Sequence, residues 1–115
     1  MKATIYHNPR CSKSRQTLAL LEEKDLDLNI IEYLKTPPDQ QTLADILSKL
    51  EISPMDLIRK GESVFTELQL DNKAGDAQAL IAAMVDNPIL IERPIVVANG
   101  KAAIGRPPES VLDIL

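Results

Sequence analysis

Cys11 is the only cysteine of the chain, and its neighbours are of the types that surround a reactive thiol. Arg10, Lys13 and Arg15 place three cations within four residues of the sulfur. A short strand pattern precedes Cys11 and a helical pattern follows it. We therefore expect the sulfur at a helix N-terminus, where free N–H groups and the helix dipole favour an anion. The helix N-terminus and the nearby cations both stabilise the thiolate, the reactive form of cysteine. The ordinary alternative is that Cys11 packs in the core as a small apolar side chain. That role would not need three cations nearby.

Three residues near Cys11 are candidates for stabilising the thiolate. Arg15 lies four positions later, so it shares a helix face with the sulfur and can reach it or an oxyanion beside it. Ser14 could donate a hydrogen bond to the thiolate, or it could be a residue that favours a helix start. His7, the only histidine, could pair with the thiolate or orient the loop, and it could equally be a structural group.

Three arginines elsewhere in the chain are candidates for binding an anion. Arg59 ends a short helical pattern, where a cation suits the helix dipole, and that explanation is sufficient by itself. Arg93 precedes Pro94, and Arg106 lies in a Gly-Arg-Pro-Pro turn; neither has a helix-face or ion-pair pattern. Guanidinium groups match tetrahedral oxyanions with two parallel hydrogen bonds. A thiolate with arginines from separate loops therefore indicates an oxyanion site, although surface arginines are also common.

The hydrophobic pattern predicts the elements that would position these residues. Strands are expected at 3–6, 28–33, 95–98 and 101–104, the last two joined by an Asn-Gly turn. Helices are expected at 12–23, from 36–39 through 50, at 53–61, from 76 to 86, and at 105–115. The first strand, helix and strand predict a parallel βαβ unit. The chain should thus be an α/β fold, a four-stranded mixed sheet flanked by helices, with a helical middle.

Composition excludes several classes of protein. With 115 residues and 44% hydrophobic side chains, the chain fits one domain with an aliphatic core. Its net charge of −4 argues against nucleic acid or an anionic membrane as a partner. No apolar run approaches about 18 residues, and no signal-peptide pattern begins the chain. A single cysteine cannot form an internal disulfide or a cysteine-rich metal site, so we expect no metal and a reducing cytoplasm.

Several separated motifs resemble the glutaredoxin-linked arsenate reductases. They are His7-Asn8-Pro9-x-Cys11-Ser12-x-Ser14-Arg15, Tyr33-Leu34-x-x-Pro37-Pro38, Leu57-Ile58-Arg59-Lys60, Ile91-x-Arg93-Pro94-Ile95-Val96-Val97 and Gly105-Arg106-Pro107-Pro108-Glu109. Together they span essentially the whole chain in order. The resemblance implies a thioredoxin-like fold with a helical insertion, as one domain over residues 1–115, and a cis peptide bond between Arg93 and Pro94.

The resemblance also implies the function of the site residues. Cys11 would be the nucleophile, and the arsenate oxygens would be bound by Arg59, Arg93 and Arg106. His7, Ser14 and Arg15 would be associated with stabilising the thiolate. Arsenate would be reduced to arsenite through an adduct on Cys11, with glutathione as co-substrate, glutaredoxin as partner and no bound cofactor.

Two departures and two alternatives accompany this resemblance. The chain stops at Leu115, short of the plasmid-type members, and carries Ser12 and Lys13 where those have smaller residues. Spx-type regulators, which bind RNA polymerase, share the fold but use a Cys-x-x-Cys switch, and here Ser14 occupies the second cysteine position. A glutathione-linked thiol oxidoreductase is the other alternative, and it would leave the arginines unexplained.

Overall fold

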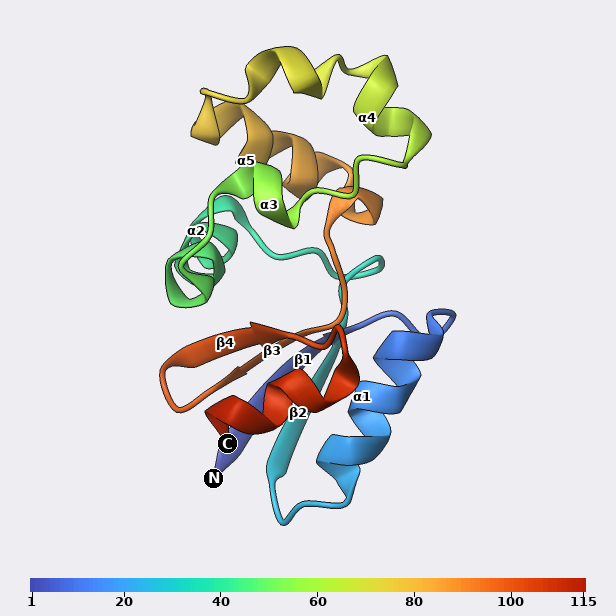
Figure 1. Cartoon of the computed structure of the whole chain (residues 1–115), viewed down its shortest axis with the longest axis vertical. Helices are drawn as coiled ribbons and strands as arrows, with labels where there is room; N and C mark the ends of the chain where they lie inside the picture. Colours follow the sequence, from blue (N-terminus) through green and yellow to red (C-terminus); the bar gives the residue numbers. More distant parts are fainter. The chain divides into compact units, whose positions relative to one another are not determined.

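The chain forms two compact units in a computed structural model that describes residues 1–115. The sheet unit comprises residues 1–36 and 93–115, and the helical unit comprises residues 37–92 (Figure 1). No helix in either unit is long and apolar enough to cross a membrane.

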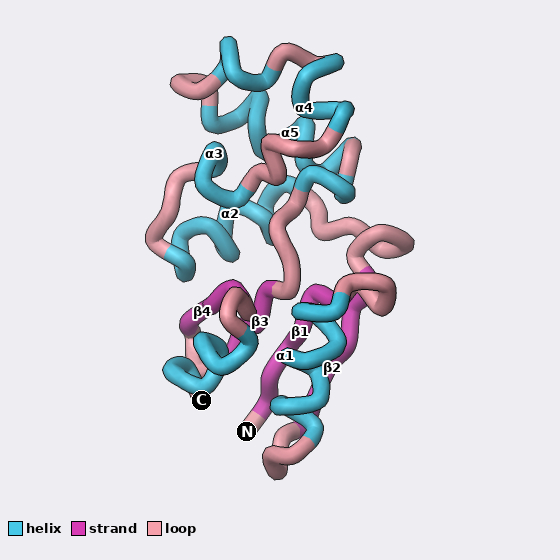
Figure 2. The backbone as a smooth tube through the Cα atoms, turned by 45° about the vertical axis from the view of Figure 1, so that its right-hand side comes forward, coloured by secondary structure: helices cyan, strands magenta, loops and turns pink.

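The sheet unit is built on four strands (Figure 2). These are β1 (Lys2–His7), β2 (Asp27–Glu32), β3 (Ile95–Ala98) and β4 (Lys101–Ile104). Their order across the sheet is β2-β1-β3-β4, with β1 and β2 parallel and the other two pairs antiparallel. The parallel βαβ unit and the mixed sheet are as the sequence predicts. Asn99 and Gly100 both have positive φ, as the predicted hairpin turn requires.

One face of the sheet packs against α1 (Ser12–Glu22) and the 3₁₀ helix η3 (Pro108–Ile114). The core between them is entirely aliphatic and contains Ala3, Ile5, Leu21, Val96, Ala98, Val111 and Ile114. Alternate residues of a strand face the same side of a sheet, so the buried ring of His7 follows Ala3 and Ile5 on this face. Because alternate residues of β1 face α1 and His7 is the last of them, the His7 side chain lies near the start of α1.

The two tyrosines of the chain are both buried in the sheet unit. Tyr6 lies in β1, and Tyr33 directly follows β2. The helical unit has Phe65 as its only aromatic residue, and the chain has no tryptophan. Aliphatic side chains therefore supply nearly all the buried surface of both units.

The helical unit consists of short helices. They are α2 (Gln40–Leu50), α3 (Pro54–Leu57), α4 (Ser63–Glu67), η1 (Leu70–Lys73), α5 (Ala77–Asp86) and η2 (Pro88–Leu90). The carboxylate of Asp39 caps α2 by accepting a hydrogen bond of 2.8 Å from the Thr42 N–H, which lowers the pKa of Asp39. Leu43, Ile46 and Leu47 are buried on α2, which packs against α5.

Several predicted boundaries are wrong. The helix expected at 53–61 ends at Leu57, because Ile58 forms a β-bridge with Ile91 and the Arg59 N–H donates to the Leu90 carbonyl. The last helix is a 3₁₀ helix that begins at Pro108 rather than at 105. The helix expected to start at 36–39 begins at Gln40, with Asp39 as its N-cap. The pattern gave no sign of α4, η1 or η2, each only three to five residues long.

Candidate active site

Cys11 is the N-cap residue of α1 and is buried. Its N–H donates to the Asn8 carbonyl at 3.0 Å, which closes the loop after β1, and its carbonyl accepts from the Arg15 N–H at 3.0 Å, which starts the helix. The side chain makes no capping hydrogen bond. The backbone of Cys11 therefore holds the helix start, and the sulfur is left available for chemistry, at the place the sequence predicts.

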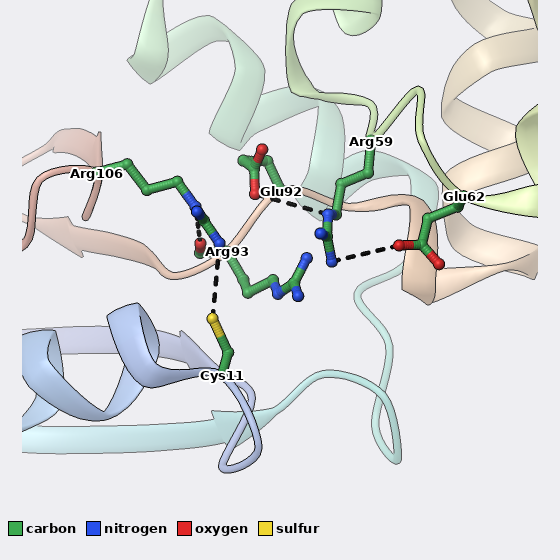
Figure 3. A network of polar contacts seen from close by, with 6 residues as sticks. All are labelled: Cys11, Arg59, Glu62, Glu92, Arg93 and Arg106. Carbon is green, nitrogen blue, oxygen red and sulfur yellow. Dashed lines mark hydrogen bonds and ion pairs between the residues drawn. The ribbon is translucent and has the colours of Figure 1, made fainter.

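The guanidinium of Arg106 contacts this sulfur. Arg106 Nη2 lies 3.6 Å from Cys11 Sγ, and Arg106 Nε donates to the Arg93 carbonyl oxygen at 2.8 Å (Figure 3). The second hydrogen bond fixes the orientation of the guanidinium plane. A positive charge held in this way stabilises a thiolate or an anion bound beside it.

Arg93 belongs to the loop between the helical unit and β3. The Arg93–Pro94 peptide bond is cis, which confirms the expectation drawn from the resemblance. The Arg106–Pro107 bond is cis as well, which the sequence analysis did not predict. Both candidate arginines of the sheet unit thus stand directly before a cis proline, and the carbonyl of one accepts from the side chain of the other.

Gly105 brings the Arg106 loop against α1 and the cis-proline loop. An added Cβ at Gly105 would overlap Thr17 Oγ1 and lie 2.7 Å from Pro94 Cγ. The Gly105 N–H donates to the Pro94 carbonyl at 2.9 Å, and the fully buried Thr17 donates to the Lys13 carbonyl at 2.8 Å. Only glycine fits here, because the Thr17 side chain and the Pro94 ring leave no room for a Cβ.

His7 and Ser14 form a buried pair beneath the loop. His7 Nδ1 and Ser14 Oγ are 2.6 Å apart, and the Asn8 N–H donates to the same hydroxyl at 3.0 Å. Burial lowers the pKa of His7 below its ordinary value of 6.5; Glu32 opposes this effect and Arg15 adds to it. The ring is therefore neutral at neutral pH. The hydrogen bonds of Ser14 go to the loop and to His7, which makes the pair a support for the loop.

Arg15 also binds the loop. Its Nη1 donates to the Pro9 carbonyl at 2.9 Å, and the side chain is exposed. The sequence predicts that this guanidinium can reach the sulfur, and the structure directs it to the loop backbone instead. Its association with the thiolate stays a prediction, as does that of His7 and Ser14.

Arg59 belongs to the helical unit. Its guanidinium forms ion pairs with Glu62 at 3.5 Å and with Glu92 at 3.9 Å (Figure 3). These carboxylates, rather than a helix dipole, are its partners within that unit. The binding of arsenate by Arg59 stays a prediction.

The chain as a whole is similar in sequence and fold to known proteins. The model of the ArsC family matches residues 6–114 of the chain. The chain belongs to the ArsC family. It is 56% identical over 112 residues to the Escherichia coli K12 protein YfgD, covering 96% of this chain and 94% of that one. It is 50% identical to the arsenate reductase of Neisseria meningitidis serogroup A, covering 96% of both.

A solved structure shows the same ArsC fold. The arsenate reductase from Vibrio cholerae matches this chain with a TM-score of 0.95 at 47% identity, covering 100% of this chain and 98% of that one. The resemblance and the thioredoxin-like α/β fold that the sequence predicts are confirmed by these comparisons.

Two residues of this ArsC site were not singled out from the sequence. Thr17 looked like an ordinary helix residue, and Gly105 was noted only as part of a motif. A threonine at helical spacing from Ser14 and Leu21 and a glycine before Arg-Pro-Pro are the available signals. Neither signal says that the two residues meet, because that contact joins α1 to the turn after β4.

The position of His7 predicts its titration. Its pKa should lie below 6.5, because burial disfavours the charged ring; Arg15→Gln should raise it and Glu32→Gln should lower it further. An NMR titration of the ring protons measures this without assignment, since the chain has one histidine. The unfolded chain binds the proton more tightly, so this contribution to stability is complete above pH 6.5 and is lost on acidification through the folded pKa. A pKa at or above 6.5 would contradict a buried neutral ring.

The close contact of Gly105 predicts the effect of adding one methyl group. Gly105→Ala should lower the free energy of unfolding by about 1–3 kcal/mol, the usual cost of overpacking, measured by urea denaturation. It should also slow iodoacetamide labelling of Cys11 at pH 7, because Arg106 is displaced from the sulfur.

Two variants serve as controls for Gly105→Ala. Gly75→Ala adds a methyl group with no atom within 4 Å, so its stability should be close to that of the wild type or higher. Thr17→Ala combined with Gly105→Ala should recover part of the loss, because two of the three atoms nearest to the added Cβ belong to Thr17. Wild-type stability of Gly105→Ala alone would show that the loops separate without cost.

Proposed function

We propose that this protein reduces arsenate to arsenite with Cys11 as nucleophile, glutathione as co-substrate and glutaredoxin as partner. The observation that carries the proposal is the contact of 3.6 Å between Cys11 Sγ at the start of α1 and Arg106 Nη2. The names of the ArsC relatives from Neisseria meningitidis and Vibrio cholerae support the reaction class.

The first step is formation of an adduct. The Cys11 thiolate attacks the arsenic of arsenate, a sulfur–arsenic bond forms, and an arsenic–oxygen bond breaks with loss of the oxygen as water after protonation. Arsenic remains in oxidation state five. The charge on the arsenate oxygens is offset by Arg106, whose guanidinium is already oriented by the Arg93 carbonyl. The α1 N-terminus contributes further positive potential.

The second step transfers two electrons. The glutathione thiolate attacks Cys11 Sγ, a Cys11–glutathione disulfide forms, and the sulfur–arsenic pair of electrons leaves with arsenic as arsenite. Because the chain has no second cysteine, the disulfide must be reduced from outside. A glutaredoxin thiol takes the glutathionyl group and returns Cys11 to the thiol.

The arginines divide into two groups in this proposal. Arg93 and Arg106 belong to loops of the sheet unit that are joined by the hydrogen bond from Arg106 Nε to the Arg93 carbonyl. We expect both side chains to bind the oxyanion. Arg59 completes the set, by the resemblance alone. In the absence of arsenate its charge is held by Glu62 and Glu92. The protein works best in a reducing compartment such as the cytoplasm, which keeps a lone thiol reduced.

Replacement of the nucleophile gives the decisive test. The wild type should support arsenate-dependent NADPH oxidation when glutathione, glutaredoxin and glutathione reductase are supplied. Cys11→Ser should reduce the rate to background, because a hydroxyl is barely ionised at neutral pH, while circular dichroism shows an intact fold. Activity retained by Cys11→Ser would mean a different nucleophile. An inactive wild type would favour the regulator or the general thiol oxidoreductase.

Lysine substitutions separate the guanidinium shape from its charge. Arg93→Lys and Arg106→Lys keep the charge but lose the planar fork. Each should lower kcat/KM for arsenate roughly 10- to 100-fold, the loss expected for a hydrogen bond to a charged group. Lys24→Arg and Lys49→Arg, on exposed surface, should have no effect. If both arginine variants remain fully active, oxyanion binding does not depend on the planar shape of the guanidinium groups.

A further inference from the structure

A cleft lies beside the nucleophile loop and is not used in the steps above. One wall is the loop before Cys11, with Asn8, Pro9 and Arg10; the other is the end of β2 and the following turn, with Glu32, Leu34 and Lys35. All these residues belong to the sheet unit.

The topology of the sheet explains why a cleft forms here. β1 and β2 are neighbouring parallel strands, and His7 and Glu32 are their last paired residues. Both loops therefore leave the sheet at the carboxyl ends of adjacent parallel strands, where α/β folds commonly bind ligands. Arg10 directly precedes Cys11, so the cleft is one residue away from the nucleophile along the chain.

The cleft has two cations and one carboxylate. The Arg10 side chain is exposed and forms no ion pair within the chain; only its backbone N–H is bonded, to Asn8 Oδ1. Lys35 and Glu32 form an exposed pair at 3.5 Å. Exposed pairs of this kind add little to stability, so a ligand with charges of its own can replace the pair. Pro9 and Leu34 are exposed apolar neighbours.

We propose that this cleft binds glutathione, a choice of ligand that rests on the proposed function. Glutathione carries two carboxylates and one ammonium at neutral pH, the complement of the two cations and the carboxylate of the cleft. Arg10 and Lys35 bind its carboxylates, Glu32 binds its ammonium, and Leu34 packs against its methylene groups.

The length of the tripeptide fits this position. Glutathione has its thiol on the central residue, and three extended residues span about 10 Å. A molecule anchored by one carboxylate on Arg10 therefore carries its thiol about half that length from the anchor, and Arg10 is the residue before Cys11. The cleft holds the co-substrate on one side of the nucleophile loop, and Arg106 contacts the sulfur from another loop.

Binding is tested with S-methylglutathione, which has no free thiol and cannot exchange with Cys11. In an NMR titration of the whole chain, the amides of Asn8, Arg10, Leu34 and Lys35 should shift. Arg10→Gln and Lys35→Gln should each weaken binding roughly twofold to fivefold, as expected for one exposed charge pair. Lys13→Gln is the matched control, because it removes a cation two residues from Cys11 but outside the cleft.

A second measurement tests whether the cleft serves the thiol chemistry. Glutathione disulfide reacts with the Cys11 thiolate to give the Cys11–glutathione disulfide and one glutathione thiolate, which mass spectrometry follows without arsenate. Arg10→Gln and Lys35→Gln should slow this reaction twofold to fivefold more than they slow the reaction with uncharged bis(2-hydroxyethyl) disulfide, which reports the reactivity of the thiolate alone.

The outcomes separate this proposal from the proposed function. Both measurements omit arsenate. A protein that cannot reduce arsenate can therefore still show glutathione binding in the cleft. The proposal is overturned if S-methylglutathione shifts no cleft amide, or if Lys13→Gln slows the glutathione disulfide reaction as much as Arg10→Gln does. The second result would mean general charge attraction instead of a site.

Discussion

The position of Gly105 against Thr17 and Pro94 is the constraint on which the geometry at the sulfur depends. These residues come from α1, from the loop before β3 and from the turn after β4. Because Gly105 itself has no side chain, the turn after β4 lies directly against the Thr17 side chain and the Pro94 ring, and Arg106 hydrogen-bonds the Arg93 carbonyl and reaches Cys11. A single methyl group at this point would push three segments apart together. The geometry around Cys11 thus depends on the contact of Gly105 with Thr17 and Pro94, and none of these three residues has a part in the proposed chemistry.

The nucleophile loop is held by hydrogen bonds from its own neighbours. Its backbone is fixed by Ser14 at Asn8, by Arg15 at Pro9 and by the Cys11 N–H at the Asn8 carbonyl. None of these bonds uses the sulfur. In the proposed reaction, these bonds would hold the backbone of the loop in place before the substrate binds, which is the advantage of preorganisation in catalysis.

Much of this architecture could be predicted from local signals in the sequence. Alternating and helical periodicity locates the four strands and α1, α2 and α5, and Asn99-Gly100 specifies its own turn. The end of α3 could not be predicted, because it is set by the pairing of Ile58 with Ile91, far away in the sequence. Similarly, the spacing of Arg15 puts it on the correct helix face but cannot say that the Pro9 carbonyl competes for it. Local pattern predicts the elements, whereas hydrogen bonds between separate segments determine where α3 ends and where the Arg15 side chain points.

The distribution of aromatic residues makes the two units spectroscopically distinct. Tyr6 and Tyr33 are both buried in the sheet unit, and the helical unit has only Phe65. Near-ultraviolet circular dichroism and tyrosine fluorescence therefore report on packing around the sheet. Four of the five α-helices belong to the helical unit, so the far-ultraviolet helical signal arises mainly there. Without any added label, the two optical signals can be compared during denaturation, and their coincidence or separation shows whether sheet and helices melt as one cooperative body.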